Sequence, residues 1–182
     1  IIFSPRANLR FNPTQNINLR LSYSSGFRAP QAFDEDMHIE NVGGTVAMIE
    51  RAKDLKEEKS QSFSVSADMY HRFGAFQTNL LIEGFYTRLT DVFVLGKPYD
   101  RGDGILVKTR SNGPGAKVMG LTLEGKVAYL SILQIQAGLT LQRSRYDEPH
   151  KWHDDAPAEK KIFRTPDTYG YFTATCTPIK PL

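Results

Sequence analysis

The chain has 182 residues, 40% of them hydrophobic, and its 23 Lys and Arg against 20 Asp and Glu give a formal net charge of +3. These charges are spread along the chain without a long basic run, so nucleic acid is not an expected partner. No run of about 18 apolar residues occurs, which excludes a membrane-spanning helix but is compatible with a membrane barrel built from strands.

Alternation of apolar and polar residues predicts long strands and almost no helix. The clearest case is INLRLSYS at 17–24, where every second residue is apolar, because successive side chains leave a strand on opposite faces. In chain order we expect strands at about 3–11, 17–27, 60–72, 76–95, 105–129, 132–146 and 167–177.

The lengths of these strands favour a membrane barrel over a soluble sandwich. A strand in a soluble protein usually has about five or six residues, whereas a tilted strand that crosses a bilayer needs about nine to eleven. Most of the predicted strands are longer than ten residues.

The connections alternate between short and long, as they do in outer-membrane barrels with short periplasmic turns and longer extracellular loops. Short ones are expected at about 12–16, 72–75, 130–131 and 178–181, and long ones at about 28–59, 96–104 and 147–166. The predicted fold is therefore all-β: an antiparallel transmembrane β-barrel segment, with apolar rows such as Leu19 and Leu21 toward lipid and polar rows such as Asn18 and Arg20 toward the lumen.

Six segments in a characteristic order carry a family resemblance along nearly the whole chain. The two most specific are GFRAP at Gly26–Pro30 and LKEEKS at Leu55–Ser60. The segments are SPRANLRF, LRLSYSSGFRAPQAFDED, DLKEEKSQSFSVSADMY, GFYTRLTDVFVL, SNGPGAKVMGLTLEGK and RTPDTYGYFTATCTP. With them the chain resembles the C-terminal part of the barrel of TonB-dependent outer-membrane receptors.

The resemblance implies TonB-dependent active uptake of a scarce solute across the outer membrane of a Gram-negative cell. The family's barrel has about 22 strands around a plugged lumen, so we expect the plug, the TonB-contacting segment and the last strands to lie outside residues 1–182. The implied partners are outer-membrane lipid, the TonB complex through that N-terminal region, and a small solute. Because the LKEEKS element lacks the tryptophan typical of starch-utilisation receptors, a metal chelate such as a siderophore, or a cobalamin-type vitamin, is the expected solute.

Other functions stay open at this point. A passive porin-like or adhesin-like barrel would share the strand pattern, and a barrel enzyme or a soluble sandwich is a further alternative. The sequence contains no nucleophile elbow, phosphate loop or zincin helix, so neither catalysis nor a cofactor is expected. The single Cys176 excludes an internal disulfide framework.

Two clusters of acidic and histidine residues have the donor atoms of metal sites without the spacing. The run Asp34, Glu35, Asp36, His38 and Glu40 lacks the glycine of a Ca²⁺ loop, which favours a solvated loop. The group His150, His153, Asp154 and Asp155 has no predicted helix to hold it. No metal site is predicted.

The long loops are expected to meet over one mouth of the barrel and to form an outer binding vestibule. Aromatic and charged groups are of the kind that fix the orientation of a solute. The expected ligand-binding residues are Arg28, Asp34, Asp36 and His38 in the first loop, Tyr99, Asp100 and Arg101 in the second, and Trp152 and His153 in the third.

Overall fold

The computed structural model describes residues 2–30, 47–102, 104–151, 157–162 and 165–177. Within these ranges all regular secondary structure is β-strand, which confirms the predicted all-β class. The described residues include no helix that is long and apolar enough to cross a membrane.

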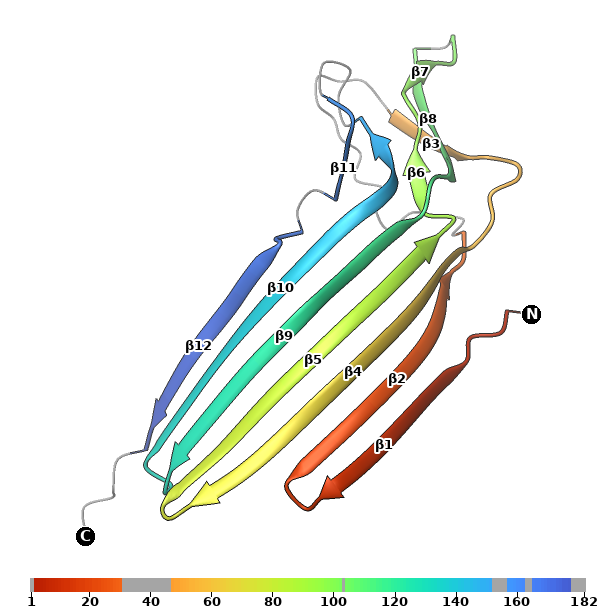
Figure 1. Ribbon diagram of the computed structural model, residues 1–182. Helices are drawn as coiled ribbons and strands as arrows, with labels where there is room; N and C mark the ends of the chain where they lie inside the picture. Colours follow the sequence, from red (N-terminus) through yellow and green to blue (C-terminus); the bar gives the residue numbers. More distant parts are fainter. Residues whose placement is uncertain (1, 31–46, 103, 152–156, 163–164, 178–182) are drawn as a thin grey trace.

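Long antiparallel strands lie side by side in one tilted, open sheet (Figure 1). At its far edge β10 pairs with two strands, with β12 along Leu133–Leu141 and with the short β11 beyond Arg145. The order across the sheet is β1 (Arg6–Thr14), β2 (Ile17–Arg28), β4 (Glu58–Phe73), β5 (Phe76–Thr90), β9 (Ala116–Tyr129) and β10 (Leu133–His150), followed by β11 (Glu159–Lys161) and β12 (Thr168–Cys176).

A second, small sheet stands at the upper end of the long strands in Figure 1. Its central strand is β8 (Leu106–Asn112), which pairs in parallel with β3 (Ala47–Arg51). On its other side β8 pairs antiparallel with β6 (Phe93–Leu95) and β7 (Tyr99–Asp100). Segments from two different connections therefore form one structure.

This small sheet corrects three sequence predictions. The expected strand 76–95 is divided at Asp91, whose φ of 55° is left-handed, and the expected strand 105–129 is divided at Gly113–Gly115. The backbone N–H of Gly113 donates to the carbonyl of Val92 at 2.7 Å, so the two breaks face each other and the chain leaves the long sheet at both. The predicted loop 96–104 is only the tip of a longer segment, residues 91–115, which we call the excursion.

The sidedness of the connections agrees with the predicted alternation. Tight turns at 15–16, 74–75 and 130–132 lie at the lower end in Figure 1, and the long connections lie at the upper end. Gly74 and Leu130 adopt left-handed φ values of 58° and 49°, which tight hairpin turns require. The expected short turn at 178–181 lies outside the described residues.

Register aligns most apolar residues in rows on one face of the sheet and most polar residues in rows on the other, with Leu81 and Phe85 of β5 as exceptions on the polar face. One row runs Leu9, Leu21, Val65, Gly84, Leu121 and Leu141. The next row, on the opposite face, runs Arg10, Arg20, Ser66, Glu83, Thr122 and Thr140. Directly paired residues share a face, so every strand contributes to one apolar surface and one polar surface.

Burial of the two faces is the reverse of that in a soluble sheet. Val65 and Leu121 on the apolar face are 59% and 48% exposed, whereas Thr140 and Ser144 on the polar face are 6% and 2% exposed. A contiguous exposed apolar surface of this kind needs an apolar medium to cover it. The apolar face is therefore the outer face of a barrel wall, and the polar face is its lumen side.

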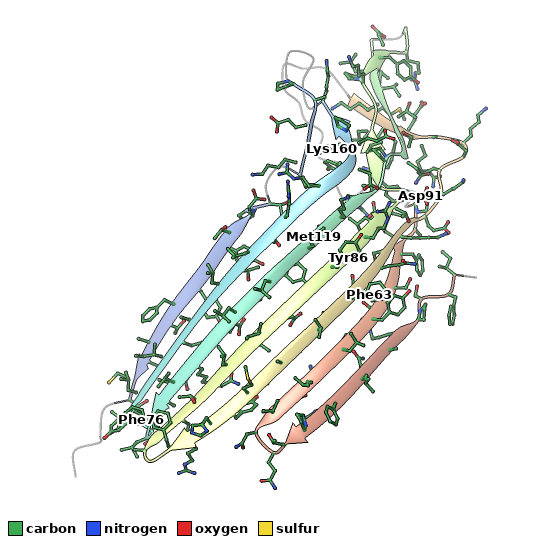
Figure 2. All side chains as sticks on the ribbon, viewed as in Figure 1. Phe63, Phe76, Tyr86, Asp91, Met119 and Lys160 are labelled. Carbon is green, nitrogen blue, oxygen red and sulfur yellow. The ribbon has the colours of Figure 1, made fainter. Side chains whose placement is uncertain are left out.

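Aromatic side chains border the apolar face at both ends (Figure 2). Near the tight turns, the ring centroid of Phe76 lies 5.4 Å from that of Phe73 and 4.9 Å from that of Tyr129. Tyr23 and Phe63, 4.8 Å apart, and Tyr86 beside them mark the upper border. In β5, Tyr86 lies ten positions after Phe76. At about 3.3 Å per residue and a tilt of about 45°, the band is about 23 Å tall, close to the ~25 Å apolar band of outer-membrane barrels.

Substituting one residue on each face tests this assignment. Leu139 lies in the row of Leu123 and Ile82, midway between the two aromatic borders, and Gln136 lies on the lumen side. In the full-length protein, Leu139→Arg should lower the free energy of unfolding by about 2 to 4 kcal/mol. Gln136→Arg should cost under about 1 kcal/mol, since its side chain stays in a polar environment. Urea unfolding in lipid vesicles measures both, and a larger loss for Gln136→Arg would invert the assignment.

Candidate functional site

Four of the nine predicted ligand-binding residues lie within the described ranges. One lies at the base of the small sheet and three lie at its tip. Arg28 ends β2, and its guanidinium lies 5.6 Å from the ring centroid of Phe93 at the base of the small sheet. Tyr99 and Asp100 form β7 at the tip, and Arg101 follows them. The structure therefore does not bring Arg28 to the other three. The remaining predicted residues, Asp34, Asp36, His38, Trp152 and His153, lie outside the described residues.

The tip of the small sheet presents chemically varied groups to solvent. Met48 and Tyr99 are 46% and 47% exposed. Arg101 Nη1 lies 3.9 Å from Glu50 Oε1 and 3.8 Å from Met48 Sδ, which links β7 to β3 across β8. Val107, the second residue of β8, pairs with both Met48 and Tyr99 and is fully buried between them. An exposed ring, a thioether and a charged pair thus sit on a rigid support.

Asp100 has a structural contact that the sequence did not indicate. Its Oδ1 accepts a hydrogen bond from the backbone N–H of Gly102 at 2.7 Å. This Asx turn holds the bend after β7, in which Gly102 has a φ of 98°. The carboxylate is therefore engaged in shaping the tip.

An open cavity of about 520 Å³ lies where β2 gives way to the small sheet. Its lining is mostly polar and comes from the segment around β3: Pro30, Glu50, Arg51, Ala52, Lys53 and Leu55. The cavity is large enough for a small solute and offers charges of both signs. Among the described residues, no group of three or more His, Cys, Asp or Glu side chains is placed to hold a metal ion.

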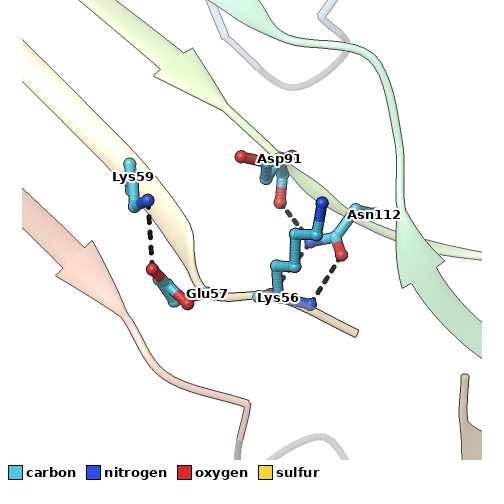
Figure 3. Close-up of polar contacts among 5 residues, drawn as sticks. All are labelled: Lys56, Glu57, Lys59, Asp91 and Asn112. Carbon is cyan, nitrogen blue, oxygen red and sulfur yellow. Dashed lines mark hydrogen bonds and ion pairs between the residues drawn. The ribbon is translucent and has the colours of Figure 1, made fainter. Parts of the chain in front are cut away.

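Asn112 fastens the small sheet to the long one (Figure 3). Its Nδ2 donates to the carbonyls of Lys56 at 3.0 Å and Asp91 at 2.8 Å, and its Oδ1 accepts from the backbone N–H of Lys56 at 2.8 Å. One side chain thereby joins the start of β4, the break after β5 and the end of β8. Sequence reasoning missed this residue, which directly precedes the break at Gly113–Gly115 between β8 and β9.

The LKEEKS element gains a physical role from the same contacts. Its Lys56 supplies the backbone groups that Asn112 binds, and its Glu58 accepts the backbone N–H of Phe93 at 3.0 Å. Glu57 pairs with Lys59 at 3.0 Å. A hydrogen bond from its own backbone, followed by the Lys59 ammonium, lowers the pKa of Glu57, so this carboxylate stays charged near neutral pH. The element anchors the small sheet to the long sheet.

Comparison with known proteins places these features in a family. The family described as "TonB dependent receptor-like, beta-barrel" matches residues 2–175. No curated protein matches the chain. Among solved structures, the siderophore receptor PirA from Pseudomonas aeruginosa is 18% identical, with a TM-score of 0.61, over 79% of this chain and 28% of that one.

The FrpB iron transporter from Neisseria meningitidis is also similar. Its F3-3 variant is 19% identical, with a TM-score of 0.56, over 79% of this chain and 20% of that one. Its F5-1 variant is 18% identical, with a TM-score of 0.57, over 94% of this chain and 26% of that one. The chain thus spans between a fifth and under a third of these structures, and at such identities the likeness shows the fold alone.

Removing the Asn112 side chain should loosen the excursion without unfolding the long sheet. Asn112→Ala deletes three hydrogen bonds to partly exposed backbone groups, worth about 1 to 3 kcal/mol together. Asn112→Asp should be as damaging, because a carboxylate cannot donate to the two carbonyls. Hydrogen exchange at the Lys56 and Gly113 amides should become about tenfold faster or more in both variants.

The matched control is Asn12→Ala, whose side chain accepts a hydrogen bond from the guanidinium of Arg10, two residues away. Exchange at Lys56 should not change in this variant. Wild-type exchange rates in both Asn112 variants would show that the side chain does not hold the excursion.

Proposed function

Because the chain belongs to the TonB-dependent receptor family, as part of its β-barrel, we propose that it serves active uptake of a scarce solute across a Gram-negative outer membrane. The observation that supports this most is the sidedness of the sheet. An apolar band with aromatic borders lies on one face, and the described parts of the long connections lie beyond one border. Such a wall divides an outer, solute-facing end from a periplasmic end with tight turns.

The described long strands make up about a third of a barrel of the family's size. β1, β2, β4, β5, β9, β10 and β12 are seven strands, and a plugged transporter has about 22. We propose that residues 1–182 belong to one barrel domain whose other strands, plug and TonB-contacting segment lie elsewhere in the protein. Energy coupling would then act through that plug.

The lumen face suits a plug that must move. Its rows combine small hydroxyl side chains with charges of both signs, as in Arg20, Ser66 and Glu83. Hydrogen bonds between two wet polar surfaces can be exchanged for bonds to water at little net cost. A pull transmitted from TonB could therefore shift the plug along this wall without stripping an apolar interface.

The proposed solute is a metal chelate such as a siderophore, or a cobalamin-type vitamin. PirA is named a siderophore receptor and FrpB an iron transporter, which supports this class. At the tip, the Tyr99 ring, the Met48 thioether and the Arg101 guanidinium suit a large organic ligand with flat and anionic parts. The outer vestibule would comprise this tip, the cavity beside β3 and the other predicted loop residues.

Uptake assays with defined chelates test the proposal. Cells carrying the full-length receptor would be offered a ferric hydroxamate, a ferric catecholate or labelled cobalamin, with and without functional TonB. At least one probe should accumulate, and accumulation should stop when TonB is removed. Uptake that continues without TonB would support the passive porin-like alternative instead.

Variants of the tip test where the solute binds. Tyr99→Ala combined with Arg101→Ala should weaken whole-cell binding of the transported probe about tenfold, which corresponds to about 1.4 kcal/mol. Gln77→Ala, beside the tight turn at the opposite end of β5, is the control and should bind like wild type. Equal binding by the double variant would remove the β7 tip from the vestibule.

A further inference from the structure

The outer face changes from apolar to basic at its upper border, over β5, β9 and β10. The row that contains Tyr86 and Met119 ends at Arg143. The next row upward on the same face joins Arg88, Lys117 and Arg145, and Arg145 pairs with Lys161 of β11. Basic side chains therefore replace apolar ones on the outer face directly above the upper aromatic border.

We call this group the outer basic cluster: Arg88, Lys117, Arg143, Arg145, Lys160 and Lys161. Among the described residues, two carboxylates form ion pairs with it. Asp147 pairs with Arg88 at 2.9 Å, and Asp167 pairs with Lys161 at 2.8 Å. Lys160 Nζ donates to the backbone carbonyl of Asp147 at 2.6 Å. Within the described residues, Lys117, Arg143 and Arg145 make no hydrogen bond or ion pair.

These three cations line a pocket of about 470 Å³ on the outer face. Met119, Tyr146, Asp147 and Lys160 complete its lining. In Figure 2, Lys160 lies above Met119, at the upper border of the apolar band. The pocket brings together guanidinium and ammonium groups, which are the groups that proteins use to bind phosphate. Asp147 also lines it, and Asp167 interacts electrostatically with Arg143 and Arg145.

A larger apolar groove of about 810 Å³ lies below the pocket and shares Met119 and Arg143 with it. Its floor follows the row of Val65, Gly84 and Leu121, where Gly84 lacks the side chain that its neighbours supply. A Cβ built at Gly84 would touch only Val65, at 3.7 Å, so the missing side chain leaves a real depression. An apolar groove that ends in a cationic pocket has the shape and polarity of a lipid with an anionic head.

We propose that the groove and the outer basic cluster bind one molecule of a phosphorylated, acylated lipid of the outer leaflet. Its phosphate would occupy the pocket of Lys117, Arg143 and Arg145, and an acyl chain would lie along Gly84. This inference rests on the proposed outer-membrane location. The position of the cluster at the aromatic border, where lipid headgroups begin, favours a lipid over free phosphate from the medium.

Native mass spectrometry of the full-length receptor in a non-ionic detergent tests the assignment. The probes are lipid A with both phosphates, the same lipid dephosphorylated, and inorganic phosphate. Diphosphorylated lipid A should bind at least tenfold more tightly than the dephosphorylated lipid, and inorganic phosphate should compete only weakly. Equal binding of the two lipids would overturn the proposal, and strong competition by inorganic phosphate would reassign the pocket to free anions.

Charge variants with a matched control locate the site. Lys117→Gln, Arg143→Gln and Arg145→Gln together should weaken binding of diphosphorylated lipid A at least tenfold. Arg10→Gln, Arg20→Gln and Lys126→Gln remove the same charge from the lumen face and should leave it unchanged. Wild-type binding by the first set would overturn the proposal.

A groove variant tests the acyl chain separately. Gly84→Leu fills the depression with a side chain suited to the apolar face, so the barrel should assemble normally while lipid A binds several-fold more weakly. Unchanged binding would remove the groove from the site. Membrane fractionation separates the two hypotheses: a receptor absent from the outer membrane contradicts the proposed function, whereas a correctly located receptor without phosphate preference contradicts only this inference.

Discussion

The structure depends on one constraint, which is that the long strands must satisfy their own backbone hydrogen bonds, since an apolar surrounding offers none. β9 does so on both edges, with fourteen paired residues against β5 and fourteen against β10. Such unbroken pairing fixes the register. A slip by one residue would move every apolar side chain of a strand onto the polar face. The continuous rows on both faces are therefore tied to backbone pairing as much as to side-chain chemistry.

The β1–β2 pairing shifts register between Phe11 and Thr14. The larger departures from the ladder lie beyond the upper aromatic border, where water can reach the backbone. There Asp91 turns the chain out of β5, and Gly113–Gly115 returns it to β9. Side chains replace the missing strand partners at this level: Asn112 binds Lys56 and Asp91, and Glu58 binds Phe93. The small sheet is thus built where water can satisfy irregular backbone, and a few polar contacts fix it to the long sheet.

Sequence alternation predicted the wall well because the pattern has the same period as the strand. The expected strands 17–27 and 60–72 correspond closely to β2 and β4. It failed at 76–95, because Val92 to Leu95 continue the apolar pattern although the backbone turns at Asp91. Pairing of β3 with β8 joins residues far apart in sequence, which local patterns do not report. For the site, residue type indicated the exposed tip at Tyr99 and Arg101, but not Asn112, whose importance comes from three backbone partners.

The parallel pairing of β3 with β8 also favours a particular order of folding. Ala47–Arg51 meets Leu106–Arg110 only across a chain segment that contains the whole β4–β5 hairpin. Contacts between residues so distant in sequence carry a high loop-closure cost until the intervening chain is folded. Once β4 and β5 have paired, their upper ends hold β3 and β8 near each other. The backbone N–H of Ala52 then donates to the Arg110 carbonyl at 2.8 Å. The loop-closure cost therefore favours pairing of β3 with β8 after the β4–β5 hairpin has formed.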